Sequence, residues 1–439
     1  MHTPPPIVSN QPFKTHFDEA FKSKLQQKTS HLSGFYKLSF EQRWEHIHQQ
    51  LTTPLSADEQ KHLYDHMGTS HPDLSEKAVE NALGYMSLPL AVATHFKIHN
   101  SEMLIPMCTE EPSVVAAASH GAKLMRHNAG IITSSTAPIT TAQIQITFDQ
   151  LSKDLITTID TCLKQHASSL IKKAQKLTEN LQKRGGGARD IDWYFIEPIH
   201  SLVILVHIHT ADAMGANIAN HVAEHLCPDI QRLFSQSSFP QSPFLQSSAG
   251  LNILTNLSLK RMVKAECSIP IHNLHQDNRK AKKLAEGIAR AYQFAKYDVF
   301  RATTHNKGIM NGVVALALAT GNDSRAIEAG AHAYASLTGS YQPLSTWHVD
   351  SSYLHGSLTM PLSVGVVGGM TQWHPTVAKL SINLLGFPRA QQLAEIMAAT
   401  GLAQNLAALR SLAGEGIQKG HMKLHRKRTT PTSPPTIKP

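Results

Sequence analysis

The sequence of 439 residues is poor in cysteine, and this scarcity excludes two classes of small, stapled domain. Its four cysteines, Cys108, Cys162, Cys227 and Cys267, lie far apart and show no CxxC spacing. Disulfide frameworks and zinc knuckles both need regularly and closely spaced cysteines. We therefore expect neither, and the cysteine usage fits a reducing compartment.

Long apolar runs are also missing. No stretch approaches the ~20 unbroken apolar residues of a membrane-spanning helix. The amino end, MHTPPPIVSNQPF, has no basic region followed by an apolar one, as a secretory leader would have. We expect a cytoplasmic protein of two or three domains that does not enter a membrane.

Acidic residues are fewer than basic ones, which gives a net charge of +9. The excess bases gather at 164–189, at 279–283 and near the carboxyl end. Aromatic residues make up only 6% and do not interleave with these clusters, so the stacking surface of a single-strand binder is not indicated. We expect no nucleic-acid partner and interpret the charge as basic pockets for an anionic cofactor. A basic nucleic-acid binder is the less favoured alternative.

Neither common nucleotide fingerprint is present. The glycines of GGGARD, at 185–190, match neither GxGxxG nor GxxxxGK[ST], so any nucleotide is held in another way. DAMGAN, from Asp212 to Asn217, lies where a strand gives way to a helix. Backbone N–H groups at such a point suit a pyrophosphate, and Gly215 allows close approach.

The order of elements between residues 138 and 249 predicts an inserted module. A strand-like TAQIQITF, a long basic helix from Asp149 to Arg184, two strand-like segments and a helix after DAMGAN follow one another. This order is typical of a split βαβ or ferredoxin-like module. We predict an α+β protein in which this small dinucleotide-binding domain interrupts a large, mainly helical substrate-binding and dimerisation domain, 34–137 and 250–420. Residues 1–33 are then an N-terminal extension, and 421–439 a short, basic, proline-rich segment expected to be disordered.

The stretch from Arg301 to Asp323, RATTHNKGIMNGVVALALATGND, is dense in committed polar groups. Asn306 is predicted to cap a helix that runs through Ala319, with Gly321 as its stop. Asp323 is predicted to cap the next helix. Core packing does not need so many amides and charges around an apolar run. The stretch is therefore predicted to contain residues of a catalytic or binding site.

Lys307 and Asn311 are four residues apart, so they share a helix face and can grip one ligand together. Lys307 and Asp323 lie at opposite ends of the same helix if it is unbroken. Their meeting in one site requires a break at Gly308 or Gly312, or a two-fold partner that supplies one of them. The alternative is that Lys307 is a solvated residue and Asp323 only a cap.

A second helix start, in EEPSVVAAASHGAKLM, carries acids and a hydroxyl. Pro112 is predicted at the first helical position, which puts Glu110, Glu111 and Ser113 at the amino end. A hydroxyl with free backbone donors favours an anion such as a ligand carboxylate. The alternative is that Glu111 and Ser113 simply cap the helix.

Histidines do not point to a metal. His221 and His225 are four apart beside Glu224, but the order is not HExxH, and chance pairs are expected among 27 histidines. We expect no metal site. His207 and His209 alternate on a strand and are expected to face a polar surface or to be in a satisfied hydrogen bond. His421, just after a glycine near the chain end, is well placed to swing over a site.

Several blocks together resemble one family. EEPSVVAAAS, DAMGAN, RATTHNKGIMNG, ATGND, AGAHAYA, VGVVGG and GLAQNLAALRSLAGEGIQKGHM, in this order, are similar to hydroxymethylglutaryl-coenzyme A reductase of the soluble, mainly bacterial class (class II), over 34–425. The resemblance implies reduction of the thioester of 3-hydroxy-3-methylglutaryl-CoA to mevalonate and CoA, or the reverse oxidation, with two hydrides from NADPH or NADH in the mevalonate pathway of isoprenoid biosynthesis. It also implies a homodimer or an oligomer of dimers, with the site between subunits.

The resemblance also assigns roles. It gives Lys307 as the cation that stabilises the charge on the thioester oxygen, Glu111 as proton donor, Asp323 as a member of the same network and His421 as the group that protonates the departing CoA thiolate. The substrate-binding positions it implies are Ser113, Arg301 and Asn311. The dinucleotide-binding positions it implies are Asp212, Met214, Gly215 and Asn217.

Two departures from the family pattern affect these expectations. Bacterial members usually carry a helical flap after the histidine, whereas a short proline-rich segment follows here, so a CoA-ligand-binding or regulatory homologue with reduced turnover is the alternative. Where NADH-preferring members carry an acid that holds the ribose, this chain has Thr178, with Lys176, Lys183 and Arg184 nearby. Bases in place of a carboxylate favour NADPH.

Overall fold

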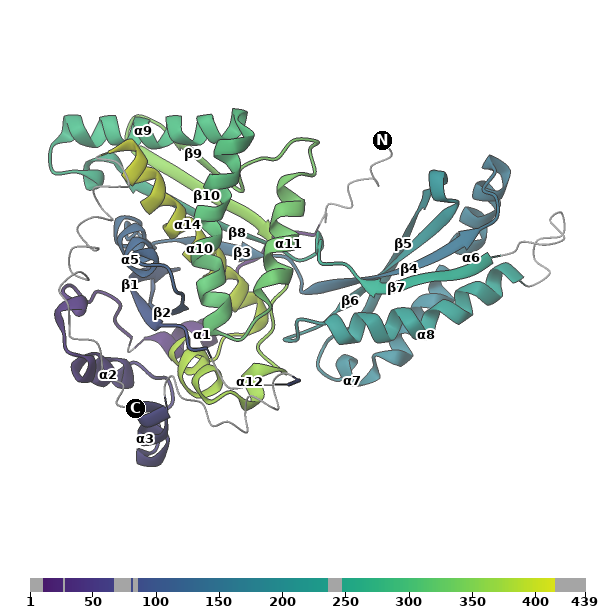
Figure 1. The fold of residues 1–439 in the computed structure, drawn as a ribbon, viewed down its shortest axis with the longest axis horizontal. Coiled ribbons are helices and arrows are strands. Elements are labelled where there is room, and N and C mark those ends of the chain that lie inside the picture. Colours follow the sequence, from purple (N-terminus) through teal and green to yellow (C-terminus); the bar gives the residue numbers. More distant parts are fainter. Residues whose placement is uncertain (1–10, 27, 67–79, 82–85, 236–246, 415–439) are drawn as a thin grey trace, which may run out of the picture.

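The computed structural model describes residues 11–26, 28–66, 80–81, 86–235 and 247–414. Helices and strands are mixed along the chain (Figure 1). The α-helices are α1 Glu19–Leu25, α2 Phe40–Gln49, α3 Ala57–His66, α5 Val114–Leu124, α6 Lys153–Leu177, α7 Glu179–Gln182, α8 Ala216–Ser235, α9 Asn278–Tyr297, α10 Val299–Ala319, α11 Ser324–Ala335, α12 Met370–Trp373, α13 Ile382–Leu384 and α14 Ala390–Ala413. The strands are β1 Leu90–Ile98, β2 Ser101–Cys108, β3 Ile132–Ser135, β4 Ile139–Phe148, β5 Gly187–Ile196, β6 Ser201–His209, β7 Ser247–Leu254, β8 Met262–Pro270, β9 Ser345–Val349 and β10 Tyr353–Pro361. Short 3₁₀ turns occupy η1 Phe35–Lys37, η2 Glu197–Ile199 and η3 Ile271–Leu274, and η4 Thr376–Ser381 is a π-helical turn. The α+β class predicted from the sequence is confirmed.

The segment around β4 to β7 forms a four-stranded antiparallel sheet of order β5-β6-β4-β7. With α6 after β4 and α8 after β6, this is the strand–helix–strand–strand–helix–strand order of a ferredoxin-like unit. β4 alternates as its sequence predicts, with Ile144 and Ile146 buried against α6 and α8 and Gln143 and Gln145 on the other face. The fourth strand, β7, runs through residue 250, so the unit of six elements continues to Leu254.

α6 is shorter than the predicted helix from Asp149 to Arg184. The Ser152 side chain accepts a hydrogen bond from the N–H of Leu155 and starts the helix there. At the other end, the Thr178 hydroxyl turns back and donates to the carbonyl of Ala174. Side-chain bonds at both ends therefore set its limits.

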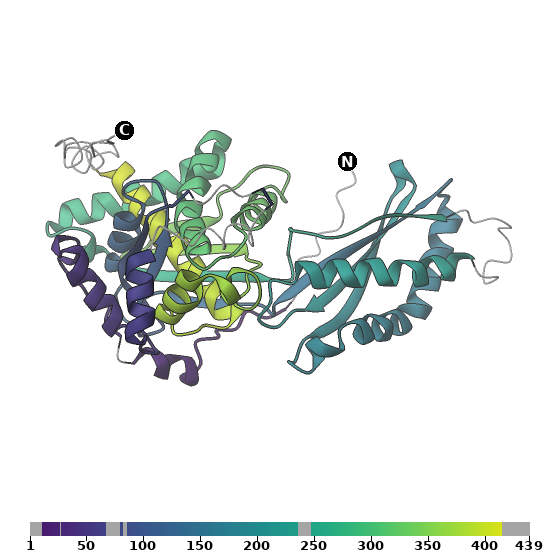
Figure 2. The same cartoon turned by 60° about the horizontal axis from the view of Figure 1, so that its bottom comes forward.

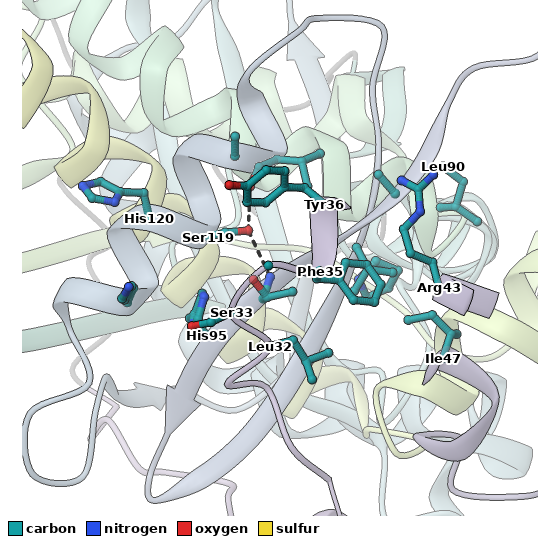
Figure 3. A pocket seen from close by; sticks show the side chains of 18 of the residues that line it. Leu32, Ser33, Phe35, Tyr36, Arg43, Ile47, Leu90, His95, Ser119 and His120 are labelled. Carbon is teal, nitrogen blue, oxygen red and sulfur yellow. Dashed lines mark hydrogen bonds between the residues drawn. The ribbon is translucent and has the colours of Figure 1, made fainter. Parts of the chain in front are cut away.

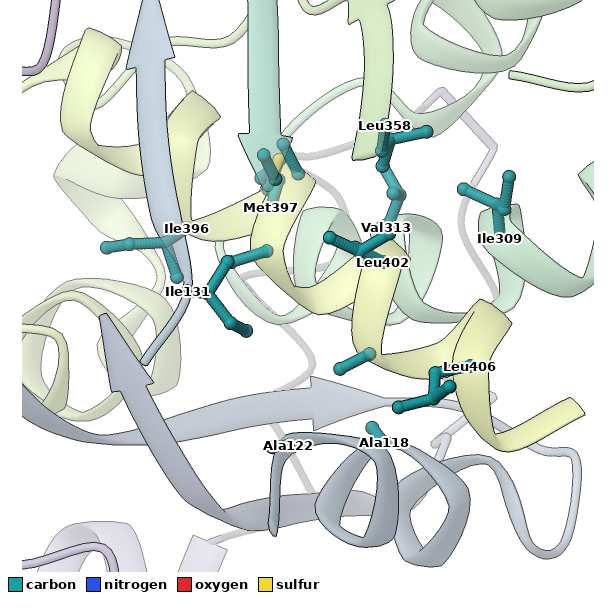
Figure 4. Packing of buried hydrophobic residues seen from close by; sticks show 14 of the residues in the cluster. Ala118, Ala122, Ile131, Ile309, Val313, Leu358, Ile396, Met397, Leu402 and Leu406 are labelled. Atoms are coloured by element: carbon teal, nitrogen blue, oxygen red, sulfur yellow. The ribbon is translucent and has the colours of Figure 1, made fainter. Parts of the chain in front are cut away.

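Much of the rest of the described chain packs around α14. This helix is buried along most of its length and contacts α5, α9, α10 and strands β3, β8 and β10. Figure 4 shows apolar side chains of α5, α10 and β10 around it. A Cβ on Gly121 of α5 would lie 1.9 Å from the carbonyl oxygen of Ala403, so the backbones of α5 and α14 touch. Only glycine permits this approach, which fixes the start of α5 relative to α10 and α14.

The structure of α10 shows where this helix begins and whether its glycines break it. It begins at Val299, capped by Asp298, so the predicted start at Asn306 is wrong. Asn306 is buried inside the helix, where its side chain bonds the backbone of Gln342 and Leu344. The helix is continuous past both of its glycines and ends at Ala319, as predicted.

α5 begins at Val114, two residues later than the sequence suggested. Ser113 is its N-cap, with φ of +76°, so Pro112 lies outside the helix and not at its first position. A residue in the left-handed region cannot continue a right-handed helix backwards. The turn that carries Glu110 and Glu111 therefore leads into the helix from outside.

Near the carboxyl end, the glycine-rich loop at 365–369 connects β10 to α12. α14 runs from Ala390 to Ala413. No helix among the described residues combines the length and apolarity that a bilayer crossing needs. All four cysteines are free thiols. A second view shows the unit of β4 to β7, α6 and α8 projecting from the body built around α14 (Figure 2).

Candidate active site

Lys307 and Glu111 form an ion pair although they lie 196 residues apart in the sequence. Lys307 projects from α10, and Glu111 lies in the turn that leads into α5. The Lys307 Nζ is 2.7 Å from Glu111 Oε2, and the two side chains are 59% and 37% exposed. A ligand from solvent therefore has access to both charges.

Ser113, two residues after Glu111, occupies the N-cap position of α5, but its side chain does not cap the helix. Its side chain makes no hydrogen bond to the first turn of α5, and its Oγ is buried without a hydrogen-bond partner among the described residues. An unsatisfied buried hydroxyl costs about 1–3 kcal/mol, so a ligand that bonds it gains that amount back. The capping alternative is wrong for Ser113, and the Glu111 carboxylate contacts Lys307 instead.

Arg301 and Asn311 lie on α10 on either side of Lys307. Asn311, one turn further along, is half-buried, and so is Arg301. Burial lowers the pKa of the Arg301 guanidinium, and no acidic side chain in the described part of the chain lies within ion-pair distance of it. Among the described residues Arg301 thus has no counter-charge, which suits a ligand carboxylate.

Asp323 caps α11, as its position suggested. Its Oδ1 accepts hydrogen bonds from the N–H groups of Arg325 and Ala326 at 3.0 and 3.1 Å. From Lys307 to Ala319, the last residue of α10, the helix covers about 18 Å at ~1.5 Å per residue. Because α10 has no break, Asp323 of one chain does not reach Lys307 of that chain, and the explanation by a helix break is wrong.

Large apolar side chains are exposed where α9 meets α10. Phe294, Tyr297, Val299 and Phe300 are 60%, 80%, 52% and 82% exposed. Neighbouring exposed apolar side chains of this kind mark surfaces that other proteins cover. They lie at the start of the helix that carries Lys307.

A cavity of about 1020 Å³ opens beside the start of α5 (Figure 3). It reaches Pro112 and Ser113, and its walls are mainly apolar. The basic side chains among its lining are Arg43, His95, His120 and Lys123. Such a cavity suits a long ligand with an apolar body and anionic groups.

Two histidines of this cavity are held neutral. Burial lowers the pKa of His95 to about 4, helped by the positive charges of His31, Lys123 and Arg126. Burial also lowers the pKa of His120 to about 4, with help from Arg410 and Lys123. His95 has φ of +68°, and its Nδ1 is buried with no hydrogen-bond partner among the residues described. Backbone strain and an unpaired ring nitrogen at a cavity wall are typical of ligand sites.

The segment from Asp212 to Asn217 forms the loop between β6 and α8. The carbonyl of Met214 accepts a hydrogen bond from Thr140 Oγ1 at 2.8 Å, and Gly215 has φ of +99°, which explains the glycine. Asn217 is exposed in the first turn of α8. The first N–H groups of a helix have no acceptor within it, so this helix start suits the pyrophosphate of a dinucleotide.

Asp212 is engaged within the protein. Its Oδ1 accepts a hydrogen bond from the N–H of Ala390, at the start of α14, at 2.9 Å. Its carbonyl accepts one from the N–H of Val366, in the glycine-rich loop, also at 2.9 Å. Asp212 thus connects the loop before α8 to two other segments.

The position of Thr178 differs from the expected ribose contact. Thr178 is 4% exposed, and its Oγ1 bonds the backbone of Ala174, Gln175 and Ala188. It closes α6 instead of facing a ligand. Lys176, Lys183 and Arg184, in contrast, are exposed at the same end of the unit.

The histidines singled out in the sequence, His221, His225 and His207, bond groups within the protein. The Nδ1 of His225 lies 2.8 Å from the carbonyl oxygen of His221 in its own helix. Within the described ranges, no group of three or more His, Cys, Asp or Glu side chains is arranged to hold a metal ion. His207 is buried and bonds Asp192 and Thr141 at 2.8 Å each, as a satisfied strand histidine was expected to do.

His421 lies outside the described residues. Residues that sequence reasoning missed are His95, His120, Lys123 and Arg261. His120 and Lys123 are three apart on α5, so their helical spacing from Ser113 was a usable signal. His95 gave none, because its role depends on a bulge between β1 and β2.

Comparisons with known proteins identify a family for this chain. Residues 39–426 match the hydroxymethylglutaryl-coenzyme A reductase family. The chain is 41% identical over 401 residues to the 3-hydroxy-3-methylglutaryl-coenzyme A reductase of Archaeoglobus fulgidus, covering 90% of this chain and 86% of the relative. It is 33% identical over 360 residues to a probable reductase of the same name from Borreliella burgdorferi, covering 81% and 78%.

Solved structures are similar as well. The reductase from Streptococcus pneumoniae superposes with a TM-score of 0.80 at 37% identity, over 90% of each chain. A structure of the class II enzyme from the same organism, bound to NADPH in open conformations, gives a TM-score of 0.79 at 37% identity, over 87% of this chain and 99% of that one.

Proposed function

The chain belongs to the hydroxymethylglutaryl-coenzyme A reductase family, and from this we infer that it is an NAD(P)H-dependent oxidoreductase that reduces 3-hydroxy-3-methylglutaryl-CoA to mevalonate and CoA. The observation that carries the inference is the exposed Lys307–Glu111 pair beside the unpartnered hydroxyl of Ser113. The family match and the similar structures do not favour the alternative of a binding protein without turnover.

Lys307 acts on the thioester oxygen. A nicotinamide held by the loop from Asp212 to Asn217 would supply the hydride, and the thioester oxygen would then carry the developing negative charge. An ammonium group fixed next to that oxygen lowers the barrier because it stabilises the charge as it forms. Glu111, 2.7 Å from the Lys307 Nζ, is placed to pass a proton to the same oxygen.

His421 and Arg301 serve the two ends of the substrate. We assign His421 to protonation of the departing CoA thiolate, since an unprotonated thiolate would add back to the aldehyde. Arg301 takes the free carboxylate of the substrate, because a guanidinium binds a carboxylate through two hydrogen bonds. Ser113 and Asn311 add hydrogen bonds at the same site.

The cavity beside α5 is our candidate for the CoA chain. It reaches Ser113, where the thioester would end, and Lys123 offers a positive charge for the phosphates of CoA. The neutral rings of His95 and His120 offer hydrogen bonds without adding charge. The cavity thus fits a ligand that is apolar in its middle and anionic at its far end.

A second copy of the chain completes the site in this proposal. Lys307 and Asp323 of one chain lie at opposite ends of α10, so a homodimer that pairs the α10 helices would bring Asp323 of one protomer to Lys307 of its partner. The exposed apolar side chains at the α9–α10 junction favour such an interface.

The small unit from 138 onwards, with its loop from Asp212 to Asn217, is proposed to bind the nicotinamide dinucleotide. The exposed bases Lys176, Lys183 and Arg184 favour NADPH over NADH, because a 2′-phosphate gains attraction from them. We place the reaction in the cytoplasm, in the mevalonate pathway.

An assay with purified protein tests the function. Mixing it with hydroxymethylglutaryl-CoA and NADPH should oxidise two equivalents of the nicotinamide for each thioester reduced, and NADH should react more slowly. Absence of oxidation with either cofactor would overturn the proposed function and favour a binding role.

A further inference from the structure

One buried cation holds the loop that is proposed to bind the dinucleotide. Arg261 lies just before β8 and is 4% exposed. Its Nη1 donates to the carbonyls of Met214 and Ala213 at 3.1 and 3.3 Å, and to Thr210 Oγ1 at 3.2 Å. Its Nη2 donates to the carbonyl of Val364, in the segment that leads to the glycine-rich loop.

The loop needs such support because its backbone is strained. Ala211 has φ of +51°, a region in which a residue with a Cβ is disfavoured, and Gly215 has φ of +99°. Strained conformations persist only when surrounding contacts fix them. The guanidinium of Arg261 bonds two consecutive carbonyls between these residues, so it supplies that constraint.

The same cation joins this loop to the glycine-rich loop. Besides the Arg261–Val364 bond, the N–H of Val366 donates to the carbonyl of Asp212 at 2.9 Å. A Cβ on Gly365 would lie 2.5 Å from the backbone nitrogen of Met214, so the two loops are in direct backbone contact. The N–H of Gly365 donates to Asn322 Oδ1 at 2.8 Å, which links this junction to the residue before Asp323.

Arg261 also keeps a positive charge beneath the start of α8. Burial lowers its pKa to about 10, opposed by the negative charge of Asp212, so it stays protonated at neutral pH. A buried cation acts through a less polar medium than water, and its field adds to that of the helix N-terminus. Both favour an anionic group at this place.

We propose that Arg261 is a positioning residue for the nicotinamide dinucleotide: it draws the carbonyls of Ala213 and Met214 inward and thereby turns the start of α8 toward the pyrophosphate. This inference rests on the proposed function and goes beyond it, since Arg261 itself does not touch the reacting atoms. It predicts an effect on dinucleotide affinity that is separate from the effect on the acyl substrate.

Three variants of the full chain test the proposal. Arg261→Met removes the charge and the donors, and Arg261→Lys keeps the charge with fewer donors. Lys28→Met is the matched control, because Lys28 is also a buried cation that donates to backbone carbonyls, those of Gln50 and Leu384, but it lies away from the loop. Steady-state kinetics with NADPH and hydroxymethylglutaryl-CoA, and amide hydrogen exchange of the peptides that contain 211–218 and 365–366, are measured for each.

For Arg261→Met we expect the KM for NADPH to rise about tenfold or more, with kcat and the KM for hydroxymethylglutaryl-CoA changed by less than about threefold. Arg261→Lys should recover part of the NADPH affinity and serves as the test variant if the methionine variant does not fold. Amide exchange in the two loops should speed up in Arg261→Met and not in Lys28→Met.

Two results would overturn the inference. One is an unchanged KM for NADPH in both Arg261 variants while the wild type turns over. The other is an equal rise of that KM in Lys28→Met, which would reduce Arg261 to general stability. A wild type that neither oxidises nor binds NADPH would instead overturn the proposed function, and the inference with it.

Discussion

The two cations at the centre of this account, Lys307 and Arg261, are held in opposite ways. The Lys307 side chain is 59% exposed and has one carboxylate partner, whereas Arg261 is 4% exposed and donates to several carbonyls and hydroxyls. The carboxylate that Lys307 pairs with, Glu111, lies two residues before Ser113, whose hydroxyl has no hydrogen-bond partner among the described residues. The Nη1 and Nη2 atoms of Arg261, in contrast, already donate to backbone carbonyls and to Thr210.

This difference in exposure and bonding matches the two proposed roles, a catalytic residue for Lys307 and a positioning residue for Arg261. A cation that stabilises charge formed during a reaction needs free hydrogen-bond donors and access to the substrate. A cation that fixes a loop needs its hydrogen bonds complete before any ligand arrives. In the proposed function, the site around Lys307 needs a second chain, whereas the hydrogen bonds from Arg261 to its loop are made within the described part of one chain.

The largest expected effect comes from the exposed cation. Lys307→Ala should lower kcat on the order of 10²–10³-fold, because the oxygen that gains charge loses its stabilising partner. The free energy of unfolding should change by less than about 1 kcal/mol, since exposed ion pairs contribute little. Nicotinamide oxidation and chemical denaturation measure the two quantities.

Lys379→Ala is the matched control for this variant. Lys379 pairs with Glu59 at 2.7 Å, with side-chain exposures of 55% and 36%, close to those of Lys307 and Glu111. It should keep near-normal turnover. Equal activity of the two variants would contradict the role of Lys307.

Ser113→Ala sharpens the contrast, because it should improve stability while harming binding. Removal of a buried hydroxyl without a partner should raise the free energy of unfolding by up to about 1 kcal/mol. The KM for hydroxymethylglutaryl-CoA should rise about tenfold, since the ligand loses a hydrogen bond in a desolvated place. A loss of stability with an unchanged KM would mean that Ser113 serves only the fold.

The cofactor side offers a smaller change in selectivity. Replacing both Lys183 and Arg184 by alanine should lower the ratio of kcat/KM for NADPH over NADH about tenfold, because two exposed charges near the 2′-phosphate are lost. The NADH value itself should stay within about threefold. A parallel loss with both cofactors would contradict discrimination at these residues.

Buried neutral histidines predict a weaker, pH-dependent effect on the substrate side. The pKa of His95 falls from 6.5 to about 4 on folding, so the unfolded chain binds more protons between these values and stability is lost as pH falls through this window. His95→Asn removes the titration and tolerates the positive φ. Between pH 7 and pH 5 it should lose about 2 kcal/mol less unfolding free energy than the wild type in urea titrations. An equal loss in both proteins would exclude His95 as a source of acid sensitivity.

Much of the fold followed from local patterns in the sequence. The alternation in β4 and the cap at Asp323 could be predicted from the sequence, because each depends on residues close in the chain. The start of α10 was missed because Asn306, a good capping residue, is instead used inside the helix to bond the segment at Gln342. Only the three-dimensional neighbourhood decides between these two uses.

Of the site residues, too, some could be predicted from the sequence and others could not. Lys307 and Glu111 were recognisable as chemistry-bearing residues, and their meeting depends on how α5 and α10 pack on α14. Arg261 could not be predicted, because a single arginine before a strand forms no sequence motif. Its proposed role depends on hydrogen bonds to carbonyls of two segments that are distant in the sequence.

Co-expression of Lys307→Ala and Asp323→Asn chains with different tags tests most directly whether the site around Lys307 is completed by a second copy. Tandem affinity purification isolates the mixed dimer, and each parent dimer should be nearly inactive. If the two residues meet across the interface, the mixed dimer has one intact site and should show about half of the wild-type turnover. A mixed dimer as inactive as its parents would contradict the account.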